Sequence, residues 1–332
     1  MLKAALRSAF LLALCLLVPM LAVSSVTRSD EYGEAVFTEI NGVKNILFLG
    51  RDDSSGLADS VILASVDTEQ TELTLVQIPR DTYIALGEDS YKKINGASGV
   101  LGGDAKLCDK LSQAFGLRVD GYISFDTRII KDLVDTFGGV EVNVPMDMDY
   151  DDPYQNLSIH LQKGKQRLTG SEAVGFVRYR AGYLRADLGR IDAQKIFLSA
   201  FAKSALEKLG SDDILPLARL TLRYIKTDLP VTALASLAKA MFDITPEKIN
   251  FVTLPGEEVQ SSKSGAWFYI LSQSGSEQLL ATLGCDGGFD GDHIFSDERR
   301  AEFEEIYDRA IEAKIYNAAE IDGEGIEIAH GN

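Results

Sequence analysis

The sequence predicts an α/β protein: a single domain with a central mixed β-sheet flanked by helices, following one N-terminal transmembrane helix. Three observations lead to this prediction. An uncharged, largely apolar stretch runs from Ser8 to Thr27. β-rich runs then recur between turn-like stretches, and a later segment repeats its apolar residues at helical spacing. Strands and helices that follow a single apolar segment are typical of one α/β domain.

The N-terminal stretch Ser8–Thr27 is long enough to span a bilayer, which takes about 20 apolar residues. Pro19 and the small residue Ala22 leave a cleaved signal peptide as an alternative, and a buried helix as another. Lys3 and Arg7 precede the stretch, and positive charges stay in the cytoplasm. We therefore predict a cytoplasmic segment 1–7, a transmembrane signal-anchor 8–27, an extracytoplasmic stalk 28–43, the main domain 44–284 and a C-terminal extension 285–332.

Composition excludes several classes of function. The 332 residues include 33 basic and 50 acidic side chains, a net charge of −17, which disfavours binding to nucleic acid. The three cysteines and three histidines form no cluster with the spacing of zinc ligands. Cys108 and Cys285 allow one disulfide or two thiols. His160 is far in sequence from the other histidines, so the pattern does not favour a Ser-His-Asp triad.

The first three β-rich runs are separated by turn-like stretches and predict three successive antiparallel strands at Asn45–Leu49, Ser60–Val66 and Leu73–Ile78. Apolar spacing predicts the remaining elements. These are strands at Gly121–Phe125, Val140–Val144, Leu157–Leu161 and Ile249–Thr253, and helices at Ala105–Phe115, Thr127–Phe137, Asp187–Leu209, Asp213–Tyr224, Val231–Phe242 and Glu298–Ala313.

Polar residues gather at one end of the three predicted antiparallel strands. Asp52 follows the first strand, Asp59 precedes the second, and Arg80 follows the third. Two carboxylates beside a guanidinium, with substrate phosphate completing the shell, suit Mg²⁺. The alternative is that these aspartates only form turns, as aspartate commonly does.

A second group of polar residues surrounds the start of the long predicted helix. Arg178, Arg180, Arg185 and Arg190 lie within thirteen residues of an acidic chain. Guanidinium groups bind phosphate oxygens in pairs, and a helix N-terminus favours anions. Gln194 shares a helical face with Arg190, and Asp187 lies one turn earlier. An anion site is one interpretation; an N-capping aspartate with surface arginines is the other.

Eight short stretches occur in a specific order and spacing: Asn45–Asp52, Ala58–Ser60, Ile78–Thr82, Lys93–Asn95, Phe137–Val142, Gly164–Leu168, Val177–Arg180 and Asp187–Arg190. Together they resemble the LytR-CpsA-Psr (LCP) family of bacterial envelope enzymes, which transfer glycopolymers. The resemblance is dense from Asn45 to Phe201 and continues more loosely through Thr253–Gly256.

The resemblance implies an extracytoplasmic transferase in the cell membrane. The donor would be a polyprenyl-pyrophosphate-linked glycan such as teichoic acid or capsule, and the acceptor a peptidoglycan hydroxyl that receives the polymer through a phosphodiester. It also implies roles for individual residues: Asp52 and Asp59 as ligands of Mg²⁺ (or Mn²⁺), Asp187 as the group that orients or deprotonates the acceptor hydroxyl, and the pyrophosphate-binding residues Arg80, Lys93, Arg178, Arg180, Arg190 and Gln194. An apolar pocket for the lipid is expected, without assigned residues.

The sequence departs from the family pattern at two places. Ala58 stands where many members carry arginine, and Arg51 is expected either to compensate or to face solvent. Ala193 and Lys195 replace a basic residue and a glutamine. Two other functions therefore stay open: a Mg²⁺-dependent hydrolase that uses water in the same site, and a noncatalytic envelope-binding protein.

Two further features have competing interpretations. Trp267 could stack on a sugar, but core packing is favoured, because buried tryptophans are commoner. The acidic run Asp147–Asp152 could bind Ca²⁺, but a solvated loop is favoured.

Overall fold

The computed structural model describes residues 42–51, 56–86, 93–154, 157–208, 220, 223–240, 244–284, 289–294 and 297–321. The predicted signal-anchor 8–27, Asp52, Cys285 and most of the predicted helix Asp213–Tyr224 lie outside these ranges. Among the described helices, none combines the length and apolar character that a membrane crossing requires.

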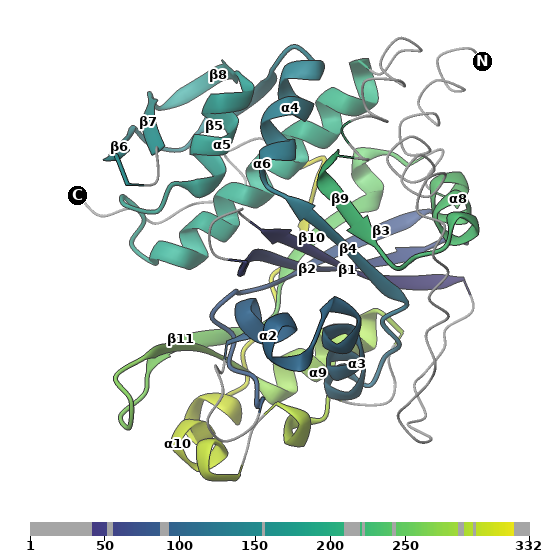
Figure 1. Ribbon diagram of the computed structural model, residues 1–332, viewed down its shortest axis with the longest axis vertical. Helices are drawn as coiled ribbons and strands as arrows, with labels where there is room; N and C mark the ends of the chain where they lie inside the picture. Colours follow the sequence, from purple (N-terminus) through teal and green to yellow (C-terminus); the bar gives the residue numbers. More distant parts are fainter. Residues whose placement is uncertain are drawn as a thin grey trace.

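A seven-stranded mixed sheet runs through the middle of the molecule in the order β13-β10-β3-β2-β1-β4-β9 (Figure 1). β2 is antiparallel to both β1 and β3, which confirms the predicted meander, whereas β4 is parallel to β1 and β10 is parallel to β3. The strands are β1 Val43–Arg51, β2 Ala58–Asp67, β3 Glu72–Ile78, β4 Gly121–Asp126, β9 Ile225–Thr227, β10 Ile249–Thr253 and β13 Tyr316–Asn317.

Helices cover both faces of this sheet (Figure 1). On one face lie α4 Arg128–Thr136, α5 Gly170–Arg178 and α6 Ala186–Lys208, and α8 Val231–Ala240 adds Leu234 to the same core. On the other face lie α2 Ile94–Leu101, α3 Asp104–Phe115, α9 Gln273–Thr282 and α10 Asp297–Tyr307. Short 3₁₀ turns occur at Pro246–Lys248 and Gly291–His293.

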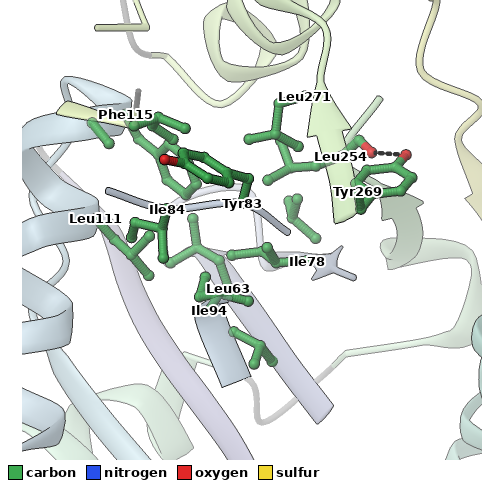
Figure 2. Packing of buried hydrophobic residues seen from close by; sticks show 14 of the residues in the cluster. Leu63, Ile78, Tyr83, Ile84, Ile94, Leu111, Phe115, Leu254, Tyr269 and Leu271 are labelled. Carbon is green, nitrogen blue, oxygen red and sulfur yellow. Dashed lines mark hydrogen bonds between the residues drawn. The ribbon is translucent and has the colours of Figure 1, made fainter. Parts of the chain in front are cut away.

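Alternation along β1 explains why there are two cores. Leu47 and Leu49 are fully buried in the core that includes α2 and α3, whereas Ile46 belongs to the core beneath α4–α6. Successive side chains of a strand point to opposite faces, so the central strands β1, β2 and β3 contribute to both cores. Figure 2 shows the first core, in which Leu63 and Ile78 of the sheet pack among residues of the loops and helices below it.

Three two-stranded antiparallel sheets extend from the helical layers, and two of them, β6–β7 and β11–β12, are hairpins. β5 Val140–Val144 pairs with β8 Gly164–Leu168, β6 Met148–Asp152 with β7 Leu157–Leu161, and β11 Gly256–Gln260 with β12 Trp267–Leu271. The prediction of a solvated loop at Asp147–Asp152 is therefore wrong, because most of this run is strand β6. Asp149 and Asp151 are exposed on one face of the strand, whereas Asp152, on the other face, is only partly exposed.

The predicted helices at Ala105–Phe115, Thr127–Phe137 and Asp187–Leu209 correspond to α3, α4 and α6. The predicted helix Glu298–Ala313 ends earlier, at Tyr307. Helix α5 was not predicted, because its nine residues are short for a periodicity signal. It carries a local signature nevertheless: Thr169 and Glu172 form a capping box at its start.

Helices α4 and α5 approach closely at Gly170, so we expect this position to reject a side chain. A Cβ there would overlap the backbone oxygen of Lys131 in α4. Gly170→Ala should lower the free energy of unfolding by about 1–3 kcal/mol through overpacking. Gly99 in α2 has open space around it, so Gly99→Ala should instead stabilise by about 0.5–1 kcal/mol. Urea unfolding of both variants measures the difference, and equal midpoints would contradict this packing.

Candidate active site

The edge of the sheet brings together a carboxylate and a guanidinium from neighbouring strands. Asp59 is the second residue of β2, and Arg80 follows the end of β3. Because the two strands are antiparallel, the start of β2 lies beside the end of β3. Arg80 Nη1 lies 2.5 Å from Asp59 Oδ1. The structure therefore places these two predicted site residues together, while Asp52 lies outside the described residues.

Asp187, in the first turn of α6, lies among three arginines. Its Oδ1 is 2.8 Å from Arg190 Nη2, 3.4 Å from Arg80 Nε and 3.8 Å from Arg180 Nη1. The side chains of Asp187 and Arg190 are only 11% and 6% exposed. A helix N-terminus also stabilises a carboxylate. One buried carboxylate thus joins the sheet edge to the arginine cluster.

The polar groups of this cluster are not fully hydrogen-bonded. Arg190 Nη2 approaches Asp187 off the hydrogen-bonding direction, so neither carboxylate oxygen of Asp187 accepts a hydrogen bond from the described residues. The Nε groups of Arg80 and Arg190 likewise have no acceptor there. Since buried polar groups are nearly always hydrogen-bonded, the cluster fits a ligand that offers both donors and acceptors, such as a phosphate together with a hydroxyl.

Burial and neighbouring charges act differently on two of the arginines. Burial, reinforced by the charges of Arg80 and Arg180, lowers the pKa of Arg190 below its ordinary value in spite of Asp187. Burial also acts to lower the pKa of Arg80, but the carboxylates of Asp187 and Asp59 outweigh it and the pKa is raised. Arginine stays protonated in either case. The crowded positive charge around Arg190 would be relieved by a bound anion.

A cavity of about 720 Å³ opens directly from the arginines between the sheet and helices α4–α6. Its polar end is formed by Asp59, Arg80, Arg178, Arg180, Arg190 and Gln194. Most of the rest is apolar, with side chains that include Phe48, Ile62, Phe125, Leu133, Val177 and Phe201. Sequence reasoning expected an apolar pocket but did not find its residues, because they come from nine separate helices and strands.

The turn between α5 and α6 holds the arginines of the two helices in place. Tyr179 and Tyr183 pack edge to face with ring centroids 5.4 Å apart. A Cβ at Gly182 would overlap the side chain of Tyr179, and a Cβ at Gly189 would overlap the side chain of Tyr183. Gln194 Nε2 donates to the carbonyl of Val177 at 3.3 Å, which ties α6 to the end of α5. Because of this close packing, Arg178 at the end of α5 and Arg190 in α6 lie on one surface.

Lys93, a predicted anion ligand, and Lys195, which departs from the family pattern, both lie outside this surface. Lys93 Nζ is 2.8 Å from Asp81 and lies over the Phe268 ring, and it does not line the cavity. Lys195 is buried and pairs with Asp192 at 2.9 Å, so it does not replace the missing glutamine of the family pattern.

Arg51 does not compensate for Ala58. Its guanidinium turns to the opposite layer, where Nη2 lies 2.6 Å from Asp104 Oδ1 and donates to Ser98 Oγ at 3.1 Å. Both expectations for this side chain are therefore corrected: it neither reaches the arginine cluster nor faces solvent, because its side chain is only 19% exposed. Ala58 itself is buried in the core.

A Ser-His-Asp arrangement is present on the β6–β7 hairpin. His160 Nδ1 lies 2.6 Å from Asp149, and its Nε2 lies 3.0 Å from Ser158 Oγ. The side chains of Asp149 and His160 are 85% and 58% exposed. Because water screens such exposed groups, we interpret the arrangement as a cross-strand polar cluster and not as a nucleophile with its base.

The structure also corrects the interpretation of Trp267 as a core residue. It is 57% exposed, whereas the other four residues of β12 are buried. Glu258, on the paired strand β11, was not singled out from the sequence. It carries no local signal, because only the hairpin register brings it near the site.

Among the described residues, no three His, Cys, Asp or Glu side chains are arranged as a ready-made metal site. The carboxylate oxygens of Asp59 and of Asp187, the latter accepting no hydrogen bond from the described residues, are nevertheless hard donors of the kind that Mg²⁺ prefers. Mg²⁺ sites commonly use only one or two carboxylates and take further oxygens from phosphate. The residues present therefore fit a metal that binds together with a phosphate ligand.

Comparison with known families agrees with this geometry. The model of the LytR_cpsA_psr family matches residues 22–284. The chain belongs to the LytR_cpsA_psr family. This confirms the resemblance found in the sequence, and the family match includes every predicted site residue from Asp52 to Gln194.

Relatives of this LytR_cpsA_psr chain include two proteins named polyisoprenyl-teichoic acid–peptidoglycan teichoic acid transferases. TagV of Bacillus subtilis is 27% identical over 248 residues, which are 72% of this chain and 63% of TagV. The chain thus spans less than two thirds of TagV. TagU of Bacillus cereus is 29% identical over 248 residues, 72% of this chain and 77% of TagU. The crystal structure of B. subtilis TagV superposes with a TM-score of 0.61 at 25% identity, covering 74% of this chain and 97% of that one.

The ion cluster around Asp187 predicts a large stability effect. Asp187→Ala leaves the buried Arg190 and Arg80 without their shared carboxylate, so the free energy of unfolding should fall by about 3 kcal/mol. The exposed pair of Glu72 and Lys248, 2.8 Å apart, is the control, and Glu72→Ala should cost less than about 1 kcal/mol. Urea unfolding measures both. If Asp187→Ala were as stable as Glu72→Ala, the carboxylate would not organise the cluster.

Proposed function

We propose that this protein transfers a glycopolymer from a polyprenyl-pyrophosphate-linked donor to a hydroxyl of peptidoglycan, forming a phosphodiester. The observation that carries the proposal is the continuity between the arginine cluster and the apolar cavity. A ligand that fits both is an amphiphile with an anionic head and a long hydrocarbon tail. The names of TagV and TagU, which include a polyisoprenyl-linked teichoic acid and peptidoglycan, support the same donor and acceptor classes.

The site divides the donor between two environments. Arg80, Arg178, Arg180 and Arg190 would hold the pyrophosphate oxygens, while the apolar wall of the cavity would hold the first part of the prenyl chain. Burying apolar surface contributes about 25 cal/mol per Å², and guanidinium groups bind phosphate through paired hydrogen bonds. Both ends of the donor therefore contribute to binding, and the bond that breaks lies at the boundary between them.

The chemistry is a displacement at phosphorus. The oxygen of the acceptor hydroxyl forms a bond to the phosphorus that carries the glycan, and the bond from that phosphorus to the bridging oxygen breaks, releasing polyprenyl phosphate. The arginines stabilise the charge that develops on the phosphate oxygens. The carboxylate of Asp187, which is ion-paired but accepts no hydrogen bond from the described residues, can accept the hydrogen of the acceptor hydroxyl and take its proton.

Asp52 and Asp59 are the proposed ligands of Mg²⁺, with Mn²⁺ as an alternative. Bound there, the metal would supply further neutralisation of the pyrophosphate charge. The ion pair between Asp59 and Arg80 supports this assignment, because it places Asp59 next to an arginine that we propose as a phosphate ligand.

The N-terminal segment 8–27 is the proposed membrane anchor, with residues 1–7 in the cytoplasm and the domain outside. Its uncharged, apolar composition supports this arrangement. Anchoring would confine the enzyme and its lipid-linked donor to one surface, which raises their effective concentration.

The full chain in detergent, given lipid-pyrophosphate-linked glycan, Mg²⁺ and a peptidoglycan oligomer, tests the activity. We expect a covalent product between glycan and peptidoglycan, together with polyprenyl phosphate, and loss of product when the metal is chelated. Free phosphorylated glycan alone would indicate a hydrolase. Binding without turnover would indicate an envelope-binding protein.

We expect the charge of Arg180 to contribute to turnover, and we do not expect Arg180 to contribute to the stability of the fold. Its side chain is 43% exposed and lines the cavity. Arg180→Ala should lower turnover roughly 100-fold, as for loss of one charge-stabilising donor, with an unchanged unfolding midpoint. Lys248→Ala, which removes a positive charge that is 42% exposed and also ion-paired, is the matched control. If Arg180→Ala and Asp59→Ala both kept full turnover, the site assignment would be wrong.

The cavity predicts a dependence on prenyl length. Leu133→Trp adds bulk inside the cavity, so the KM for a long-chain donor should rise at least tenfold. A donor with a very short prenyl chain should be affected little. Ile315→Trp, at an exposed position, is the control and should change neither KM. An equal effect on both donors would place the lipid elsewhere.

A further inference from the structure

The β11–β12 hairpin presents an exposed aromatic side chain on a strand that is hydrogen-bonded to the segment following Arg80. Trp267 is more than half exposed, which is unusual for the largest apolar side chain. In the hairpin register Gln260 is opposite Trp267, and Glu258 is opposite Tyr269. Alternating residues of paired strands share a face, so Trp267, Gln260 and Glu258 lie on one face of the hairpin.

This hairpin is attached directly to the segment that carries Arg80. The backbone N–H of Tyr269 donates to the carbonyl of Asp81 at 2.9 Å, and the N–H of Tyr83 donates to the carbonyl of Tyr269 at 2.9 Å. The Tyr269 hydroxyl donates to the carbonyl of Leu254 at 2.8 Å (Figure 2). The backbone therefore holds β12 rigidly against the residue that follows Arg80.

The two glutamates at the centre of β11 have different environments. Glu257, on the opposite face, pairs with Arg309 at 2.8 Å. Glu258 has no hydrogen-bond or ion-pair partner among the described residues. The Glu258 side chain is exposed. Partial desolvation, followed by the charge of Asp187, raises the pKa of Glu258, with Asp81 adding to the effect and Arg185 opposing it. The register pairs Glu258 with Tyr269, the residue of β12 whose backbone is hydrogen-bonded to Asp81.

The hairpin and the cavity approach the sheet edge from opposite layers. The cavity lies between the sheet and α4–α6, whereas β11 and β12 belong to the layer of α2, α3 and α10 (Figure 1). None of Asp81, Glu258 or Trp267 lines the cavity. A donor that fills the cavity and the arginine cluster therefore leaves the hairpin face open for a second substrate.

We propose that the hairpin face of Trp267, Gln260 and Glu258 binds a sugar ring of the acceptor glycan. The indole packs against the apolar face of the ring, and the carboxylate of Glu258 accepts a hydrogen bond from a ring hydroxyl. Gln260 donates through Nε2 to the carbonyl of Gly265 at 2.9 Å, so its amide oxygen is fixed and available as a second acceptor. Neutral, hydroxyl-rich carbohydrate is the ligand class that this combination of an aromatic plane and hydrogen-bond acceptors suits.

This inference rests on the proposed function, because the face is assigned to the acceptor of that same reaction. It adds the acceptor-binding residues, which lie outside the arginine cluster and the cavity. A sugar on this face would place one of its hydroxyls toward Asp187, where the displacement at phosphorus takes place.

Trp267 is the only tryptophan in the chain, so its fluorescence reports on this face alone. The full chain in detergent is titrated with a peptide-free tetrasaccharide of alternating N-acetylglucosamine and N-acetylmuramic acid, without donor or metal. We expect a saturable blue shift of the emission. No shift at millimolar tetrasaccharide would overturn the proposal. A shift that depends on protein concentration without glycan would show self-association on this face and would also overturn it.

Variants of the two adjacent glutamates provide a matched pair. Glu258→Ala should weaken tetrasaccharide binding roughly tenfold, the value of about one hydrogen bond to a charged group. Glu257→Ala, on the opposite face of the same strand, should leave binding unchanged. Equal weakening by the two variants would mean that the hairpin matters only as a scaffold.

A kinetic measurement separates this inference from the proposed function. Trp267→Ala should raise the KM for the peptidoglycan acceptor at least tenfold and leave the binding of geranylgeranyl pyrophosphate unchanged, and Trp267→Phe should restore much of the loss. Full transfer with an unchanged acceptor KM would overturn the inference and leave the proposed function intact. A fluorescence shift without any transfer would overturn the proposed function and leave the inference about the hairpin face intact.

Discussion

The shared carboxylate of Asp187 is the constraint on which the site depends. Three guanidinium groups from two distant parts of the chain approach it, and without it they would repel one another in a partly buried space. Its position is fixed by the first turn of α6, and the position of Arg80 is fixed by the end of β3. Helix packing and sheet pairing are therefore coupled through one ion cluster. The same cluster has excess positive charge, which suits a phosphate ligand.

The two layers on either side of the central sheet present different kinds of side chains, and both layers reach the same edge of the sheet. The layer of α4–α6 contributes the guanidinium groups and an apolar cavity, and the opposite layer contributes the β11–β12 hairpin with its exposed indole and acceptor oxygens. A lipid-linked anion and a carbohydrate require such different surfaces. In the proposed reaction both would meet at one phosphorus atom, and the sheet can support both surfaces because its central strands contribute side chains to a core on each face.

Where sequence reasoning failed, the missing information was a contact between distant segments. Arg51 was expected to replace the missing arginine or to face solvent, but its partner Asp104 lies 53 residues away and on the other face of the sheet. Trp267 was assigned to the core because most tryptophans are buried, yet it lies at the end of β12 where the hairpin extends past the core. The acidic run after Met146 was assigned to a loop, because exposed aspartates hide the alternation of an edge strand.

The sequence by itself determined the class of fold, the meander of the first three strands, the long helix α6 and the family. Period-2 and period-3.6 patterns are local, and the motifs that carry the resemblance are short and keep their order. It also identified Asp59, Arg80, Arg180, Asp187 and Arg190, because charged residues that interrupt such patterns are conspicuous. Only the tertiary structure decided which groups share Asp187, which apolar residues form the cavity, and that Glu258 and Trp267 share one face of the β11–β12 hairpin. Those facts depend on the crossing of helices and the register of strands, which no local pattern encodes.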